Sequence, residues 1–149
     1  MKTTIQKYTL SAELLQEGVE DPFGAYKSEG RALYATSHNK YRVKVRNNET
    51  GYSMSFIYYG TAAEFKQGTT VLSEERLLNV LVYAISKADL GKMSFPSYCD
   101  SIGCDPELKA SRKAHRACMV LLDKFENDLL MGSDEQRILT ELILEPVKL

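Results

Sequence analysis

The sequence contains no tryptophan, only three cysteines among its 149 residues, and no apolar run approaching the roughly 18 residues of a membrane-spanning helix. Three cysteines leave at least one thiol unpaired, and no secretory signal peptide precedes them. Because free thiols are typical of reducing compartments, we expect a cytoplasmic protein that makes no contact with a membrane.

Motifs that would indicate catalysis are also missing. Neither Gly-x-x-x-x-Gly-Lys-Ser/Thr nor Gly-x-Gly-x-x-Gly occurs, which excludes the usual glycine loops that cradle phosphates. The chain has only two histidines, and its many carboxylates are scattered without forming a recognisable acid–base pair. The sequence therefore predicts a protein that is not an enzyme, with no catalytic residue and no cofactor.

The composition is that of a globular domain, with 44% hydrophobic and 26% charged residues. The length suits a single domain that covers residues 1–149. The formal net charge of −1 argues against a polyanion mimic and against a uniformly basic nucleic-acid binder. The charges are nevertheless segregated, with acidic residues at both ends and basic residues in the middle, a pattern that is also compatible with a homodimer.

Residues 40–59 give the clearest local prediction, a β-hairpin closed by a four-residue turn at 48–51. Apolar and basic side chains alternate along its first strand with the period of two that indicates one buried and one exposed face. Gly51 stands at the turn position that favours positive φ. The expected cross-strand pairs are Tyr41 with Tyr58, Val43 with Phe56, Val45 with Met54, Lys40 with Tyr59, Arg42 with Ile57 and Lys44 with Ser55. A slip by one residue would mix the two faces, so the register is well determined.

The rest of the first half is predicted to be mainly β. Residues 3–10 alternate enough to form a strand, whereas 11–16 favour one or two helical turns. Residues 18–30 read as a surface loop, 31–36 favour another strand, and 37–39 favour a turn.

The second half is predicted to be helical, because its apolar residues recur three or four apart. The first helix is expected to begin after a Ser73 cap and to end at Gly91, and the second to begin after a Ser94 cap and to end at Gly103. The third is expected to begin after an Asp105 cap, with Pro106 in its first position, and to end at Gly132. The fourth is expected to begin with a Ser133–Gln136 capping box and to stop before Pro146. Together these elements predict an α+β fold. An antiparallel β-meander in residues 1–70 packs against a bundle of about four helices in residues 71–149.

The segment 94–130 carries a family resemblance. Its pattern F-x-x-Y/W-C-x-x-x-G-x-D, followed after 11 residues by A-C, resembles a group of small phage and prophage proteins. The matching residues are Phe95, Tyr98, Cys99, Gly103, Asp105, Ala117 and Cys118. The similarity continues weakly upstream through the hairpin, and it departs from the group at Cys104 and His115, where the group has tyrosine. The resemblance implies a phage origin and a location in the host bacterial cytosol, but no activity.

All three cysteines lie in this segment with His115, which raises two chemical alternatives. Zinc would take Cys99, Cys104, His115 and Cys118 as ligands, although the spacing C-x4-C-x10-H-x2-C is unusual for a closed tetrahedral site. A nucleophilic Cys99 or Cys104 would need His115 as its base, but neither an acidic orienting residue nor an oxyanion motif accompanies them. Free cysteines also pack as small apolar residues, and we expect Cys99 and Cys118 to be buried, reduced and metal-free.

Two basic surfaces are the candidate partner-binding sites. The first is the outer face of the predicted hairpin, with Lys40, Arg42, Lys44, Arg46 and Tyr59. The second lies off the apolar stripe of the predicted long helix, with Lys109, Arg112, Lys113 and Arg116. The helix dipole does not favour cations in the first turns of a helix, so a contribution to helix stability does not explain why these four cations occur there. The alternative for both surfaces is an ordinary solvated face without function.

These observations, with the resemblance, predict a non-enzymatic phage-encoded protein that binds and inhibits a host protein of a bacterial defence system such as CRISPR–Cas. The partner would then be a host protein, for example a defence effector that handles nucleic acid. The alternative is a nucleic-acid-binding accessory protein of phage replication or recombination, because a sheet face with Lys, Arg and Tyr suits single-stranded nucleic acid. We expect weak or absent oligonucleotide binding, because the acidic remainder of the chain offsets the basic patch.

Overall fold

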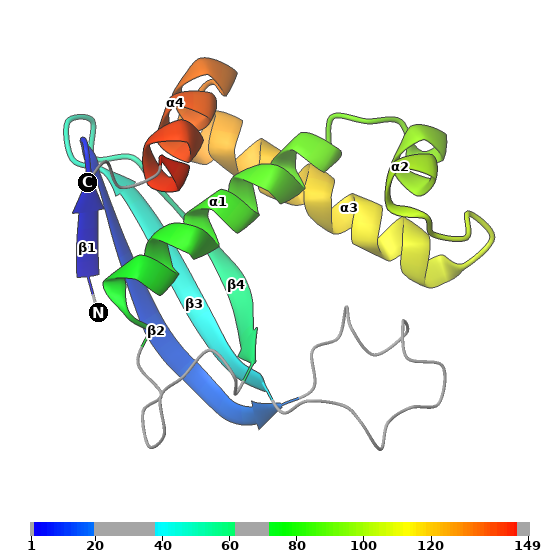
Figure 1. Cartoon of the computed structure of the whole chain (residues 1–149), viewed down its shortest axis with the longest axis horizontal. Helices are drawn as coiled ribbons and strands as arrows, with labels where there is room; N and C mark the ends of the chain where they lie inside the picture. Colours follow the sequence, from blue (N-terminus) through cyan, green and yellow to red (C-terminus); the bar gives the residue numbers. More distant parts are fainter. Residues whose placement is uncertain (1, 20–37, 62–71, 146–149) are drawn as a thin grey trace.

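The structure is a computed structural model that describes residues 2–19, 38–61 and 72–145 (Figure 1). Four strands form one antiparallel sheet in the order β1-β2-β3-β4. They are β1 (Lys2–Ile5), β2 (Tyr8–Val19), β3 (His38–Asn47) and β4 (Ser53–Thr61). The helices follow as α1 (Glu74–Leu90), α2 (Phe95–Ile102), α3 (Lys109–Asp123), the π-helical η4 (Lys124–Asp128) and α4 (Ser133–Leu144). The predicted α+β fold, with a β-meander before the helices, is confirmed.

The hairpin of β3 and β4 has the predicted register, including all six expected cross-strand pairs. Gly51 has a φ of +81°, as its place in the turn requires. Asn47 holds the turn together, because its side-chain Oδ1 accepts hydrogen bonds from the backbone N–H groups of Glu49 at 2.9 Å and Thr50 at 3.3 Å. Local turn chemistry and the alternating pattern therefore agree in this hairpin.

The start of the chain differs from its prediction. The expected strand over residues 3–10 is instead a hairpin, because the chain turns between β1 and β2 and Gln6 adopts a φ of +51°. The helical turns expected over 11–16 were wrong, since these residues belong to β2 and pair with β3. His38 and Asn39 lie in β3 rather than in a turn. Cross-strand pairing overrides weak local preference here.

Two other predictions for this half concern residues that lie largely outside the described ranges. The expected loop over 18–30 is described only at Gly18 and Val19, which end β2, and the expected strand over 31–36 is not covered.

Two serine caps lie where they were predicted. The Ser73 side chain accepts from the Arg76 N–H at 3.1 Å, and the Ser94 side chain accepts from the Ser97 N–H at 3.3 Å. Gly91 ends α1, and Gly103 ends α2 with a left-handed φ of +73°.

The predicted start of the long helix was wrong. Asp105 accepts from the Glu107 N–H at 2.9 Å within a turn, so Pro106 belongs to that turn and not to the helix. The helix α3 begins at Lys109 behind Leu108, which makes no side-chain cap hydrogen bond.

The predicted junction at Gly132 was also wrong. The long helix widens into η4, and Leu130, with a φ of +56°, takes the left-handed position that usually favours glycine. Gly132 is instead the N-cap of α4, so Ser133 is already helical. Gln136 donates from its side chain to the Met131 carbonyl at 3.0 Å rather than closing a capping box.

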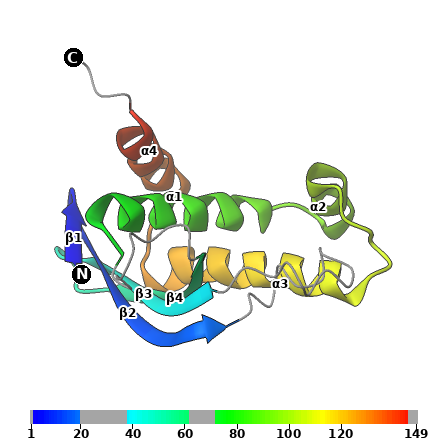
Figure 2. The same ribbon diagram turned by 60° about the horizontal axis from the view of Figure 1, so that its bottom comes forward.

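The helix α1 lies over the inner face of the sheet and also along α3 (Figures 1 and 2). The main core fills the space between these elements, η4 and α4. Its largest fully buried members include Tyr8, Tyr41, Leu77, Leu81, Phe125, Leu129 and Leu139. Within the described residues, no helix has the length and apolar content to cross a membrane.

A second, smaller apolar cluster lies beyond the sheet. It is formed by residues 95–118, which comprise α2, the turn after it and the first two thirds of α3. These residues extend away from the strands in Figure 1 and are called the tip below. Tyr98, Cys99 and Cys118 are buried there, and partly buried apolar side chains pack around them: Leu90, Phe95, Cys104 and Ala114. Most of the residues that carry the family resemblance lie in this tip, and three of them form its core.

Candidate functional site

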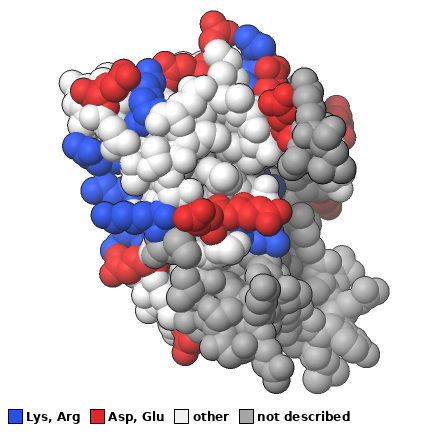
Figure 3. All heavy atoms as spheres, turned by 60° about the vertical axis from the view of Figure 1, so that its left-hand side comes forward, with Lys and Arg blue, Asp and Glu red and all other residues white. Residues whose placement is uncertain are grey.

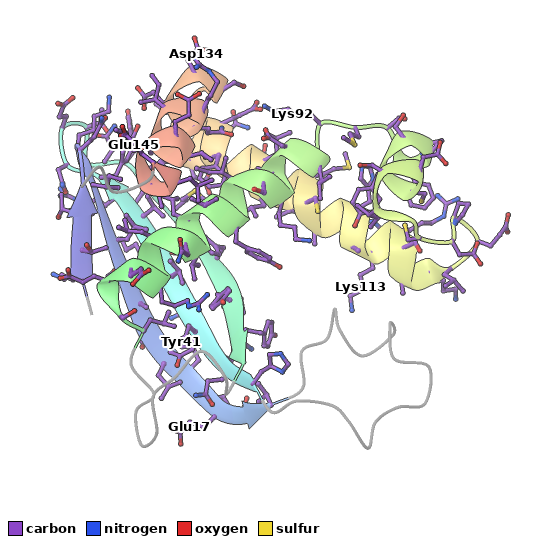
Figure 4. The ribbon with its side chains drawn as sticks, in the orientation of Figure 1. Glu17, Tyr41, Lys92, Lys113, Asp134 and Glu145 are labelled. Carbon is purple, nitrogen blue, oxygen red and sulfur yellow. The ribbon has the colours of Figure 1, made fainter. Side chains whose placement is uncertain are left out.

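The outer face of the sheet carries the first predicted basic surface. Arg42, Lys44 and Arg46 are exposed and Lys40 is half-buried, whereas the alternating residues of β3 point to the core. Tyr41, labelled in Figure 4, is one of these inward residues and is 2% exposed. The structure therefore gathers the four predicted cations of β3 on one face, which we call the basic sheet face.

Hydroxyl groups flank the basic sheet face on both neighbouring strands. In the ladder, Arg46 pairs with Thr9 and Ser53, and Lys44 pairs with Ser11 and Ser55. Arg42 and Lys40 lie farther along β3, beside Ile57 and Tyr59 of β4. Hydroxyls and cations of this kind are the side chains that commonly hydrogen-bond to phosphate oxygens.

The charges of this face are only partly neutralised. Arg42 Nη1 lies 3.4 Å from Glu13 Oε2, but both side chains are more than half exposed, at 52% and 66%, so the pair contributes little stability. Arg46 donates to the Asn48 side chain at 3.1 Å. Neither Lys40 nor Lys44 has an ion pair with any residue that the structure describes. The face therefore retains positive charge toward solvent.

The second predicted surface lies on α3. Lys109, Arg112, Lys113 and Arg116 are all exposed, and none forms an ion pair within the described ranges. The Arg112 guanidinium lies 4.7 Å from the centre of the Phe95 ring, a cation–π contact that joins α3 to α2. Lys113 projects away from the helix bundle in Figure 4. We call these four residues the basic helix face.

The cysteine cluster of the tip is structural in character. Cys99 and Cys118 are buried as expected, at 4% and 5% exposure, and all three cysteines are free thiols. The weak zinc alternative is not supported, because nowhere in the described chain do three His, Cys, Asp or Glu residues group closely enough to hold a metal ion.

His115 is engaged in holding the tip together. Its Nε2 lies 2.8 Å from the Met93 carbonyl, to which it donates. Its ring contacts Phe95 and Tyr98 with centroid distances of 5.7 Å and 4.9 Å. Burial raises the pKa of the Cys99 thiol to about 11 and also raises that of Cys118, so both thiols are protonated at neutral pH. A Cys99 thiolate nucleophile activated by His115 does not fit this arrangement.

Replacing Cys118 by serine is expected to lower the free energy of unfolding by roughly 1–3 kcal/mol. The new hydroxyl would be buried in an apolar cluster, where the Tyr98 side chain that bonds the Cys118 thiol can satisfy only part of its hydrogen-bonding capacity. Chemical denaturation measures the loss. Cys104→Ser is the matched control, since Cys104 is only partly buried at the margin of the same cluster. Equal losses in the two variants would show that the Cys118 site does not exclude a polar group.

Sequence reasoning missed a contact between α4 and the first hairpin. Glu135 accepts hydrogen bonds from the Tyr8 hydroxyl and from Lys7 Nζ, the latter at 3.1 Å. These residues line a hollow of about 360 Å³ together with Gln6, Glu49, Ile138 and Leu139. In Figure 3, which brings the side of β1 forward, acidic and basic side chains are interspersed. No local signal could have revealed a contact across 127 residues of sequence.

Stability at acidic pH is expected to depend on this contact. The Tyr8 hydrogen bond, with help from Lys7, lowers the pKa of Glu135 in the folded protein. A lowered pKa contributes stability above the unfolded value, near 4.3 for glutamate, and this contribution is lost as the pH falls through the folded pKa. Because Glu135 is 41% exposed, the contribution should stay below about 1 kcal/mol.

The measurement is urea denaturation between neutral and acidic pH. Glu135→Gln should flatten the acid limb of the stability curve. Glu141→Gln, which removes only an exposed ion pair with Arg137 on the same helix, should change the curve little. An identical acid limb in the wild type and Glu135→Gln would contradict the prediction.

Comparison with family models, with curated proteins and with solved structures finds no match for this chain. Support for a function therefore comes from the residues of the two basic faces themselves.

Proposed function

We propose that this chain is a non-enzymatic, phage-encoded protein that binds and inhibits a host protein, such as an effector of a CRISPR–Cas defence system. The observation that carries the proposal is the basic sheet face. Its cations stand on a rigid strand, project from the side opposite the core and have few acidic neighbours. Such a face supplies the charge complementarity that guides association with an acidic surface.

The resemblance to phage proteins gives the proposal its biological setting. A phage protein of this size that carries no recognisable catalytic motif would act on its host by binding. A partner that handles nucleic acid in the host bacterial cytosol fits a basic binding face, because such partners present acidic or nucleic-acid surfaces.

Reversing two charges of the basic sheet face should abolish activity without unfolding the protein. In Arg42→Glu/Lys44→Glu, both substitutions are at exposed sites, where changes in stability usually stay within about 0.5 kcal/mol. Association with the partner should slow strongly, because the electrostatic attraction becomes repulsion. Thermal melting and a phage-protection assay in a bacterial strain with an active defence system measure the two effects.

Arg76→Glu/Arg137→Glu is the control, and its thermal melting is measured as well, because Arg76 is half-buried and Arg137 pairs with Glu141 at 3.3 Å. It makes the same change in net charge on α1 and α4, away from the sheet's outer face. The proposal predicts full protection by the control and none by the sheet variant. Full protection by the sheet variant would remove this face from the interface.

A second candidate function is a nucleic-acid-binding accessory protein of phage replication or recombination. The observation in its favour is the composition of the basic sheet face, where hydroxyl side chains on β2 and β4 flank the cations of β3. Purification of the protein with phage replication intermediates would distinguish this role from inhibition of a defence system.

A further inference from the structure

The two basic faces lie on the same side of the molecule. The helix α1 covers the inner face of the sheet and packs along the buried stripe of α3, so closely that Gly91 lies against the backbone of Cys118. The outer face of the sheet and the exposed side of α3 must then both point away from α1. Figure 2 shows this arrangement, with the sheet and α3 together below α1.

The two faces are also joined edge to edge. The strand β4 is at one edge of the sheet, and η4, which continues α3, packs against it. Lys124 of η4 donates from Nζ to the backbone carbonyl of Ser55 at 2.8 Å. The basic sheet face therefore continues through η4 into the exposed side of α3, and we call the whole the basic side.

In the described part of the chain, the basic side holds fewer carboxylates than cations. Glu13 lies opposite Arg42 on β2, Glu17 is exposed farther along the same strand, and Asp123 is the single acidic residue of α3. Glu126 and Asp128 of η4 are exposed at the junction, so the positive charge is concentrated on β3 and on the first turns of α3. The acidic residues of α1 and α4 lie in the layer on the other side of the sheet. Their effect on a ligand at the basic side is weak, because charges more than about 8–10 Å apart in solvent are largely screened at physiological salt.

We infer that the basic side binds the sugar–phosphate backbone of a nucleic-acid duplex. This inference deepens the second candidate function, nucleic-acid binding, and rests on it, because it identifies the kind of nucleic acid that the basic side would take. Exposed cations flanked by hydroxyls match phosphate contacts. An interface with a protein usually has an aromatic or apolar centre. On the outward positions of β3 and β4 the large apolar groups are Ile57 and the half-buried Tyr59. Met119 and Val120 are exposed on α3, so the eight cations of the two faces still outnumber the apolar side chains.

The same surface favours a duplex over a single strand. Single-strand binders stack successive bases on aromatic side chains. Along the outward positions described for β3 and β4, Tyr59 is the one aromatic residue, and it is half-buried. The cations are instead spread over a strand and a helix, which suits a broad ligand with two charged backbones. Recognition would be independent of base sequence, since contacts to phosphates carry no information about the bases.

The test is fluorescence anisotropy with a labelled DNA duplex of mixed sequence and with one of its single strands, at salt concentrations between about 50 and 200 mM. We expect the full chain to bind the duplex, and to bind it more tightly than the single strand. This replaces the expectation from sequence of weak or absent oligonucleotide binding, which counted the acidic residues of α1 and α4 against the basic patch. Arg42→Glu/Lys44→Glu and Lys113→Glu/Arg116→Glu should each weaken duplex binding by about tenfold or more. Each should also lower the slope of log affinity against log salt by about 2, because each lost phosphate contact removes about 0.9.

The combined fourfold variant should lose more affinity than either pair, whereas Arg76→Glu/Arg137→Glu should retain both affinity and slope. Thermal melting of each variant confirms that it is folded. Loss of binding in the control would mean that net charge alone is responsible and would overturn the inference. So would tighter binding to the single strand, or an effect confined to one of the two faces.

Failure of this inference can be told apart from failure of the proposed function. If the wild type does not bind the duplex but Arg42→Glu/Lys44→Glu still abolishes phage protection, the inference is wrong and the partner contacts the basic sheet face through an acidic protein surface. If the duplex is bound and every variant still protects phage, the duplex site stands and the proposed inhibition through this face is wrong.

Discussion

Replacing Gly91 by alanine is expected to destabilise the protein by about 3 kcal/mol, at the upper end of the usual loss for overpacking. A Cβ atom at this position would lie 2.6 Å from the Cys118 carbonyl oxygen, 2.7 Å from its carbonyl carbon and 2.9 Å from the Met119 nitrogen. These are backbone atoms, which cannot rotate away as a flexible side chain can. The substitution therefore has to push α1 and α3 apart where they meet most closely.

Chemical denaturation of Gly91→Ala measures this effect, and Gly132→Ala is its control. A Cβ atom at Gly132 has no neighbour within 4 Å, and its φ of −74° suits alanine. The control should lose no more than about 1 kcal/mol, through the weaker capping of α4 by alanine. A Gly91→Ala variant as stable as the control would mean that the two helices can separate without losing contacts.

Phe125→Ala is expected to cost about 3–5 kcal/mol, as is usual for removing a fully buried phenylalanine. The ring belongs to η4 and is 0% exposed within the main core. Its removal would leave a cavity where the helices meet the edge of the sheet. Val120→Ala serves as the control, because Val120 is 54% exposed on α3, where substitutions usually change stability by within about 0.5 kcal/mol. A similar midpoint of denaturation for both variants would show that η4 is not anchored by its aromatic ring.

The parts of the fold that could be predicted are those in which one local signal dominates. The hairpin of β3 and β4 combines strict alternation with a turn that needs Gly51, so pattern and turn chemistry fix the same register. Ser73 and Ser94 were identifiable as caps because a serine hydroxyl reaches the third following N–H without help from tertiary structure.

The incorrect boundaries share a physical cause, which is competition between local signals. Asp105 and Pro106 suit both a helix start and a turn, and the turn prevails. Glycine is the usual residue for a left-handed helix end, yet the π-helical widening of η4 places Leu130 at that position instead of Gly132. The residues of β2 lack a strong strand pattern and are held by pairing with β3, which is a long-range effect.

For the candidate site, sequence identified the cations but not their arrangement. The alternation in β3 predicted that Arg42 and Lys44 share an exposed face, and the structure confirms it. The position of that face relative to α3 depends on how α1 packs on both, and on the edge contact between Lys124 and Ser55. Neither the periodicity of one element nor its composition contains that information.

The small core of the tip also changes what the motif in residues 95–118 can mean. Tyr98, Cys99 and Cys118 are buried together, and Gly103 supplies the left-handed corner between the helices. The motif thus describes how one corner of the chain is built. Two proteins could share every motif position and still recognise unrelated targets, because Lys113, Arg116 and the cations of β3 lie outside it. A search guided by the motif would collect relatives in architecture, and their targets would have to be compared through the surface charges that each one carries.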